Sequence, residues 1–272
     1  MYRRRRQSTA VAAIFTFVVA LLVADVAYPA GARAFGAVGP GAAAMRHQAP
    51  LLIPTPQNFA VQGVDTSHYE HGGPFNWWTL AHGGPRFISI KATEGLTITD
   101  PWFGTDITAA RAAHMIRTAY HFFDPTEGGA AQAAHFLSVV HSYGLTGTHR
   151  YELPLVLDLE KIPNKGCGAS ARVIQTQVLA FIRQVERVSR PPIIYTQRNY
   201  VMQCMAGSTE LSGYMLWLAD YGKQTPPHVP GNSGWSFWQY SDSGQAPGIN
   251  HVVDLNAFNG TYGQLKHLAD LN

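Results

Sequence analysis

The stretch LPLVLDLE, residues 153–160, is a run of apolar residues that ends abruptly in two acidic ones. The near-continuous apolar run predicts a buried strand. Because alternate side chains of a strand leave the same face, Asp158 and Glu160 should point to one side, roughly 6–7 Å apart along the strand. Two charged groups at the end of a buried strand are unfavourable unless other groups compensate. The rest of the chain must therefore bring partners to them.

Seven further apolar or β-branched segments, each bounded by turn residues, predict strands. They cover residues 61–67, 86–95, 116–125, 191–196, 214–222, 235–242 and 252–258. Apolar residues at three- and four-residue spacing predict helices over 105–115, 128–144 and 170–189. Strands that alternate with helices imply a parallel sheet, and eight of them indicate an α/β fold: an irregular TIM-like β/α barrel, a single domain with its last helices reduced. A doubly wound open sheet is the alternative, although no Gly-x-Gly-x-x-Gly motif follows the first strand.

The N-terminal region has the pattern of an export signal. Four arginines, Arg3 to Arg6, precede an apolar run over residues 10–24. This run is shorter than the roughly 20 apolar residues that a membrane-spanning helix needs. We therefore predict a signal peptide over residues 1–34, cleaved after Ala-Arg-Ala at 32–34, and a secreted, periplasmic or cell-envelope protein. An uncleaved anchor is the alternative, and only that would bring the protein to a membrane.

Most of the basic character of the chain belongs to this N-terminal segment. Residues 1–34 carry five of the 20 Lys and Arg and one of the 17 Asp and Glu, so the remainder carries 15 basic and 16 acidic residues. No basic run remains that would argue for a nucleic-acid partner, and nothing indicates an obligate protein partner. Residues 35–57, rich in Gly, Ala and Pro, predict a linker, and residues 58–272 the folded catalytic domain.

The chain has two cysteines, Cys167 and Cys204. In an exported protein an even pair favours a disulfide. Two free thiols are the alternative.

Further acids are expected beside Asp158 and Glu160. Asp65 ends the first predicted strand and Asp254 falls in the last, and in a barrel of this type reactive groups gather at the carboxyl ends of strands. Converging carboxylates suit glycoside hydrolysis, in which burial and neighbouring negative charge raise the pKa of one group so that it keeps its proton. Helix caps, salt bridges or ligands of magnesium or calcium are alternative roles. Since no His lies at a metal-ligand spacing from these acids, we expect no metal and no other cofactor.

Aromatic residues on or just beyond the predicted strands favour a polysaccharide cleft. They are Tyr120, Phe122, Tyr195, Trp217, Tyr221, Trp238 and Tyr240. Each alone is more often a core residue, but a set of them beside four acids suits the stacking of sugar rings. The isolated histidines His68, His82 and His121 are expected to be structural or on the surface.

Eight segments of this chain, in order from Gln62 to Phe258, resemble the glycoside hydrolase family 25 lysozymes, the muramidases of Chalaropsis and bacteriophage type. The matching segments are GVDTSHYE (63–70), FISIKATEGLTITDPWF (87–103), RTAYHFFDP (117–125), LPLVLDLE (153–160), PPIIYT (191–196), LWLADYG (216–222), FWQYSDSGQAPGI (237–249) and VDLN (253–256). The resemblance implies hydrolysis of the β-1,4 bond between N-acetylmuramic acid and N-acetylglucosamine in peptidoglycan, with retention.

The resemblance also implies roles for individual residues. Glu160 would be the general acid/base, Asp158 the second central carboxylate, and Asp65 and Asp254 would orient groups and tune charge. The sugar cleft would be lined by Tyr120, Tyr195, Trp217, Tyr221 and Gln239. The nucleophile is either a carboxylate or the 2-acetamido oxygen of the substrate. Two other functions stay open: hydrolysis of another N-acetylglucosamine polymer such as chitin, and a wall-binding module without turnover.

Overall fold

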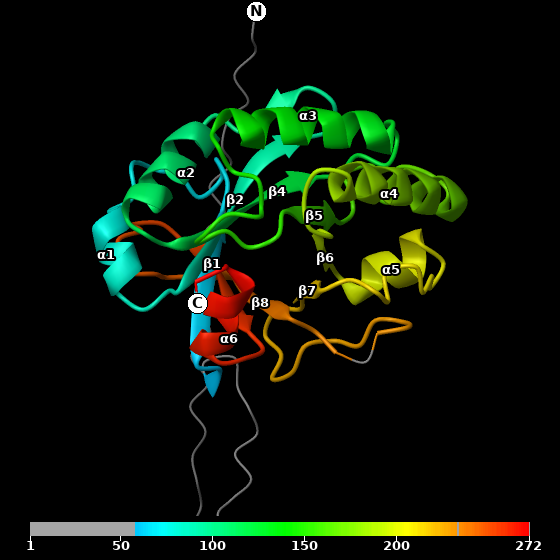
Figure 1. The fold of residues 1–272 in the computed structure, drawn as a ribbon. Helices are drawn as coiled ribbons and strands as arrows, with labels where there is room; N and C mark the ends of the chain where they lie inside the picture. Colours follow the sequence, from blue (N-terminus) through cyan, green and yellow to red (C-terminus); the bar gives the residue numbers. More distant parts are fainter. Residues whose placement is uncertain (1–57, 233, 272) are drawn as a thin grey trace, which may run out of the picture. The chain divides into compact units, whose positions relative to one another are not determined.

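The computed structural model describes residues 58–232 and 234–271; the predicted signal peptide and linker lie outside these residues. All eight predicted strands are present and form a closed barrel (Figure 1). They are β1 (Val61–Thr66), β2 (Phe87–Glu94), β4 (Ile116–Phe122), β5 (Val156–Leu159), β6 (Ile193–Thr196), β7 (Leu216–Ala219), β8 (Phe237–Gly244) and β9 (Val253–Phe258). A short additional strand, β3 (Ile98–Thr99), pairs antiparallel with the end of β2.

The barrel is mixed, which corrects the prediction of a parallel sheet. The strand order is β1-β9-β8-β7-β6-β5-β4-β2, and pairing of β1 with β2 closes the ring. Six of its pairs are parallel, whereas β9 runs antiparallel to both β8 and β1. The physical reason is the length of the connection: residues 245–252 form a loop too short for the crossover that parallel neighbours need.

The three predicted helices are confirmed as α2 (Phe103–Ala112), α3 (Gly129–Ser142) and α4 (Ala171–Glu186), which lie along the outside of the strands (Figure 1). Three shorter helices were not predicted: α1 (Trp77–His82), α5 (Arg198–Cys204) and α6 (Tyr262–Leu268). The last helices are reduced, as expected, because α5 has seven residues and no helix is found among the described residues between β7 and β9. None of the described helices has the length and apolar character needed to cross a bilayer.

The inside of the barrel is apolar at one end and polar at the other. At the amino-terminal end of the parallel strands, inward side chains such as Phe87, Ile116 and Phe237 form a buried cluster that α6 closes through Leu265. Gly63 leaves room for the Phe87 ring, since a Cβ there would lie 2.4 Å from it. Two residues further along each strand the same inward face turns polar. The fold thus places polar side chains at the carboxyl end of a sealed barrel.

Candidate active site

A pocket opens at the carboxyl end of the barrel strands. It has a volume of about 100 Å³, and its lining includes all four predicted acids and all five predicted substrate-binding residues. The lining residues are Asp65, Ser89, Tyr120, Val156, Asp158, Glu160, Tyr195, Trp217, Tyr221, Gln239 and Asp254. Ser89 and Val156 were not singled out from the sequence. The strand alternation therefore brings residues from all eight barrel strands, and from the loops that follow two of them, around one small space.

Asp254 reaches this pocket because β9 is antiparallel. It lies near the start of β9, and in the antiparallel ladder it sits directly opposite Asp65 of β1. In a parallel β9 the same position would lie at the other end of the barrel. The antiparallel direction of β9, which was not predicted, therefore places Asp254 beside the other three acids.

Gln239 of β8 links the acids on one side of the pocket. Its Nε2 donates hydrogen bonds to Asp65 (2.8 Å) and Asp254 (3.0 Å), and its Oε1 accepts from the hydroxyls of Tyr195 and Tyr221, both at 2.7 Å. The side-chain amide therefore has protein partners for both hydrogens and both acceptor positions. Gln239 is buried, and it orients the acids and the tyrosines around the space.

Asn256 donates a hydrogen bond to Asp65 and was not predicted from the sequence. Its Nδ2 donates to Asp65 Oδ2 (2.7 Å), while the indole Nε1 of Trp217 donates to Asn256 Oδ1 (2.8 Å). Asn256 stands two residues after Asp254 on one strand, so alternation places both on the same face. That spacing was the available signal.

Burial and mutual repulsion raise the pKa values of all four carboxyls. Burial, followed by the charge of Asp65, raises the pKa of Glu160 to about 7, although Lys91 opposes this. Burial and the nearby Asp65 raise the pKa of Asp254 to about 9, and burial raises that of Asp65 to about 6 against its hydrogen bonds from Gln239 and Asn256. The pocket therefore holds protons at neutral pH, as general acid catalysis requires.

Asp158 has one buried carboxylate oxygen, Oδ1, that lacks a hydrogen-bond partner among the described residues. Burial, and then the charge of Glu160, raise the pKa of Asp158 well above its ordinary value, while Lys91 lowers it. An unpartnered carboxylate oxygen beside a proton donor is suited to meet positive charge that develops on a bound substrate.

Comparison with known proteins decides the family of this chain. The model of Glycosyl hydrolases family 25 matches residues 64–249, which is more than half of the sequence and includes every residue of the pocket lining except Asp254. The chain belongs to glycoside hydrolase family 25. It is thus a glycoside hydrolase, and the family resemblance seen in its motifs is confirmed.

Relatives and solved structures of family 25 agree with this. Lysozyme M1 of Streptomyces globisporus is 36% identical over 215 residues, covering 77% of this chain and 71% of the relative. The N,O-diacetylmuramidase of Chalaropsis sp is 36% identical over 220 residues, covering 77% of this chain and 99% of the relative. The crystal structure of the bacterial lysozyme from Streptomyces coelicolor superimposes with a TM-score of 0.72 at 33% identity, covering 78% of this chain and 99% of that one. The irregular barrel is thus the fold of this family.

Lys91 is a further charged residue of the family 25 site that sequence reasoning passed over. It is buried on β2, and its Nζ donates to Glu94 Oε2 at 2.7 Å and lies 5.0 Å from the centre of the Phe122 ring. Its charge lowers the pKa values of both Asp158 and Glu160. A lysine inside the apolar run FISIKATE was the signal, because a buried lysine needs a negatively charged neighbour.

The predicted aromatic set divides into two groups. Tyr120, Tyr195, Trp217 and Tyr221 line the pocket, whereas Phe122, Trp238 and Tyr240 do not. Trp238 and Tyr240 pack with Ala257 in a separate apolar cluster. Trp217 is 1% exposed, so only its edge borders the pocket. The aromatic part of the pocket lining therefore consists mainly of tyrosines.

The isolated histidines lie outside the pocket, as expected. His121 is buried, with Nδ1 2.7 Å from Thr93 Oγ1 and Nε2 3.1 Å from Gln132 Oε1, and burial lowers its pKa to about 3. His68 pairs with Asp100 at 2.8 Å. His82 is exposed. Among the described residues no group of three or more His, Cys, Asp or Glu side chains could hold a metal ion.

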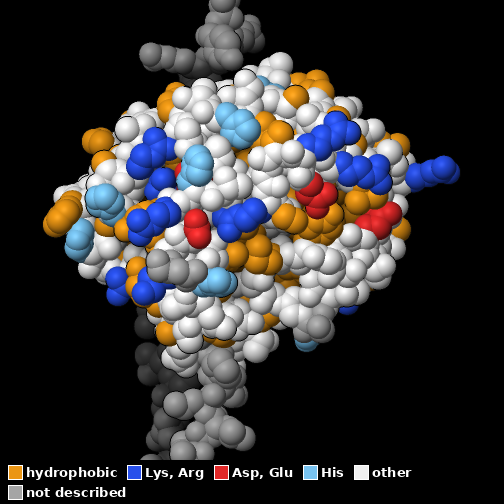
Figure 2. Space-filling model, viewed as in Figure 1, with side chains coloured by type: hydrophobic (Ala, Val, Ile, Leu, Met, Phe, Trp, Pro, Cys, Tyr) orange, Lys and Arg blue, Asp and Glu red, His pale blue; other side chains and the backbone are white. Residues whose placement is uncertain are grey.

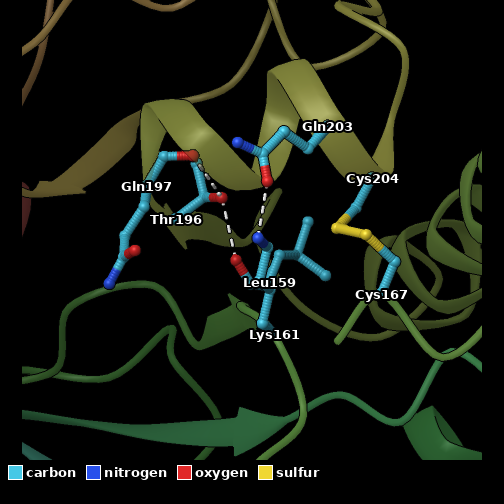
Figure 3. Close-up of a disulfide and its surroundings, with 7 residues drawn as sticks. All are labelled: Leu159, Lys161, Cys167, Thr196, Gln197, Gln203 and Cys204. Carbon is cyan, nitrogen blue, oxygen red and sulfur yellow. Dashed lines mark hydrogen bonds between the residues drawn. A yellow bond between two sulfur atoms is a disulfide. The ribbon is translucent and has the colours of Figure 1, made fainter. Parts of the chain in front are cut away.

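A disulfide holds the loop that follows Glu160. Cys167 and Cys204 are bonded, with their Cα atoms 5.2 Å apart, which confirms the predicted pair. Figure 3 shows the bond joining this loop to α5, with two further links nearby: Lys161 donates to Gln203, and Thr196 Oγ1 donates to the carbonyl of Leu159 at 2.8 Å. The chain on either side of Glu160 is thereby attached to α5 and β6.

Proposed function

We propose that this family 25 hydrolase is a secreted muramidase that cleaves the β-1,4 bond between N-acetylmuramic acid and N-acetylglucosamine in peptidoglycan. The observation that carries the proposal is the convergence of four acids in one pocket, with burial raising the pKa of Glu160 to about 7. The names of the relatives, a lysozyme and an N,O-diacetylmuramidase, support this substrate.

Glu160 acts as the general acid and then as the general base. In its neutral form the carboxyl donates its proton to the glycosidic oxygen as the bond to the anomeric carbon breaks, and the saccharide beyond the bond leaves as an alcohol. The resulting carboxylate then takes a proton from water, whose oxygen attacks the anomeric carbon from the face that the first saccharide left. Two successive displacements retain the configuration at that carbon.

Asp158 is the second carboxylate of the reaction. Its buried, unpartnered Oδ1 supplies negative charge in the same pocket as Glu160. In a retaining reaction the first displacement is made by Asp158 or by the substrate's own 2-acetamido oxygen. In both routes Asp158 stabilises the positive charge that develops during that displacement.

Asp65, Asp254 and Gln239 keep the pocket in its working geometry. Gln239 fixes both aspartates and the hydroxyls of Tyr195 and Tyr221, so it positions other groups and has no amide position left for the substrate. The tyrosines, together with Tyr120, form the walls against which a sugar ring lies. We assign Gln239 to positioning on this basis.

Fragment analysis tests the substrate. Purified peptidoglycan digested with the enzyme should yield fragments with a new reducing end on muramic acid, identified by mass after borohydride reduction. Reducing ends on N-acetylglucosamine, or faster release of fragments from chitin, would contradict the proposal. Binding to walls without fragment release over a long incubation would show a binding module instead.

Action on peptidoglycan also requires that the protein reach the cell wall. The basic N-terminus and the short apolar run within residues 1–34 support export. Residues 35–57 would then link the N-terminus of the mature protein to the catalytic domain. Intact mass of the protein recovered from culture medium tests this: loss of the first 34 residues is expected, whereas a full-length chain that remains with the membrane fraction would establish an anchor.

A further inference from the structure

A second recess lies at the opposite end of the barrel from the pocket of acids. It has a volume of about 250 Å³ and is lined by Ala81, His82, Pro85, Arg86, Ala113, His114, Met115, Ile116 and Tyr262. These residues come from the end of α1, the turn before β2, the turn before β4 and the start of α6. We name it the basic recess, because its charged and titratable side chains are His82, Arg86 and His114 and none of its lining residues is acidic.

The cations at the basic recess are not neutralised by neighbouring acids. The Arg86 guanidinium lies 5.3 Å from the centre of the Tyr262 ring, and Lys266 Nζ lies 5.5 Å from the same ring. No described Asp or Glu is within ion-pair distance of either side chain. Two cations therefore lie near one exposed aromatic ring, and both keep their charge available for an external anion.

Basic side chains continue beyond the recess. His114 lies 5.9 Å from the Tyr151 ring, which also lies beneath the guanidinium of Arg150 at 6.0 Å. Figure 2 shows Lys, Arg and His side chains gathered on this face over α1, α2 and α6, with acidic side chains sparse among them. Residues 58–272 carry 14 Lys and Arg against 16 Asp and Glu, so the face is not a result of net positive charge. The pocket thus gathers four acids at the carboxyl end of the strands, and the basic recess gathers cations at the opposite end.

We propose that the basic recess and the cations around it form a docking surface for an anionic polymer of the cell wall, in which sugar or polyol units are joined by phosphodiesters. Arg86, with His82 and His114, would hold one phosphate in the recess, and Lys266 and Arg150 would meet neighbouring phosphates along the chain. Arginine recognises phosphate through paired N–H donors. The exposed rings of Tyr262 and Trp78, the latter 3.9 Å from the His82 ring between centroids, offer faces for the units between phosphates.

The surface favours a polymer over a lipid bilayer. Membrane-surface segments combine basic residues with a continuous apolar face, rich in aliphatic residues, that enters the acyl region. Among the described residues, the segments that line the basic recess expose no Leu, Ile, Val or Met side chain, because Leu80, Met115 and Leu265 are buried. A concave site for one anion, flanked by further cations, fits a flexible chain of phosphates.

The inference rests on the proposed action at the cell wall but not on the chemistry of the acids. Docking through the far end of the barrel would hold the enzyme on a polyanionic wall while the pocket stays open to glycan strands. The surface is thus assigned to retention on the wall, and its effect should be separable from turnover.

Co-sedimentation of the full chain at low temperature tests the proposal. The probes are walls that retain their phosphodiester polymers, the same walls after hydrofluoric acid has removed phosphate, and phosphatidylglycerol vesicles. The double variant Arg86→Glu/Lys266→Glu should bind the phosphate-bearing walls at least about tenfold more weakly than the parent, with the effect shrinking as salt rises. Binding to stripped walls and turnover of a soluble glycan fragment should not change.

Two controls keep the result decisive. Arg172→Glu, an exposed reversal on α4, changes the net charge without touching the basic recess, and Arg86→Gln removes one charge with less disturbance than a reversal. The proposal is overturned if stripped walls bind the parent as well as untreated walls do, if Arg172→Glu and Arg86→Gln weaken binding equally, or if vesicles bind more tightly than walls. If the parent protein does not cleave the soluble fragment, the muramidase proposal is contradicted. The docking proposal is then judged from the binding measurements alone.

Discussion

Asp65 of β1 and Asp254 of β9 lie directly opposite one another in the antiparallel ladder that closes the barrel, and both accept a hydrogen bond from Nε2 of Gln239. Two acids at such close quarters repel each other when both are ionised. The bridging amide offsets part of that repulsion by donating to each. This relationship makes Gln239 the residue through which the arrangement of the pocket is most directly tested.

Replacing Gln239 by Glu should lower kcat by about a hundredfold, with the fold retained. The new carboxyl cannot donate to Asp65 and Asp254 unless it takes up a proton, and it adds a further acid to the group. Steady-state kinetics on peptidoglycan fragments measure the effect, and its pH profile should shift because the added charge raises neighbouring pKa values. Gln245→Glu, the same change on the exposed loop before β9, is the matched control. Equal activity of both variants would refute the positioning role.

The activity should fall as pH rises through about 7. Glu160 must be protonated to act as the acid, and burial raises its pKa to about 7, so the alkaline limb of kcat/KM reports this group. Lys91 holds that pKa down, and therefore Lys91→Met should move the alkaline limb to higher pH. The exposed Lys165→Met should leave it in place. A limb that moves to lower pH in Lys91→Met would contradict the assignment.

Asp254→Asn should stabilise the fold while it lowers activity. Below about pH 4 the carboxyl is protonated in both the folded and the unfolded chain, so it does not change the free energy of unfolding. As pH rises from 3.8 toward the folded pKa of about 9, the unfolded chain releases its proton and the folded chain keeps it, so the free energy of unfolding falls. The amide removes this penalty, which is at most about 4 kcal/mol at pH 7 because each pH unit above 3.8 contributes about 1.4 kcal/mol. Denaturant unfolding at pH 4 and pH 7 measures it, with the exposed Glu210→Gln as control; a gain that is equal at both pH values would refute the mechanism.

Removing the disulfide should destabilise the domain. The bond joins residues 37 positions apart, for which constraint of the unfolded chain predicts about 4 kcal/mol. Cys167→Ala/Cys204→Ala should unfold at lower denaturant concentration than the parent, and it should lose activity near its lowered unfolding temperature because the loop after Glu160 is released. Thiol titration of the unreduced parent in denaturant is the check, since two free thiols would disprove the bond.

Much of the site could be predicted because strand alternation is visible in the sequence. Asp158 and Glu160 are two apart after an apolar run, and that pattern alone placed both on one face. Asp254 was predicted as a residue of the site, but the sequence did not show how it reaches the pocket. Periodicity indicates which face of a strand a residue occupies and does not indicate the direction of the strand. The eight-residue connection over 245–252 was the missing clue, because it is too short for a parallel crossover.

Other parts of the site escaped prediction for physical reasons. Lys91 acts through its charge on Asp158 of β5, and Asn256 through a hydrogen bond to Asp65 of β1. Both partners are distant in sequence, so local patterns mark the two residues as unusual but do not identify what they act on. Gln239 was predicted as a site residue, but its hydrogen bonds to four protein groups could not be predicted, because only the closed barrel assembles them. The basic recess likewise joins residues from four separate segments, two helix ends and two turns.

The central claim is that Glu160 delivers the proton that breaks the glycosidic bond. Glu160→Gln keeps the shape of the side chain and removes the titratable proton, so the initial rate of reducing-end release from purified peptidoglycan, measured near pH 6 on a variant shown to be folded, is the most direct test. A fall of at least about a thousandfold is expected. A variant that releases fragments at the rate of the parent enzyme would contradict the account.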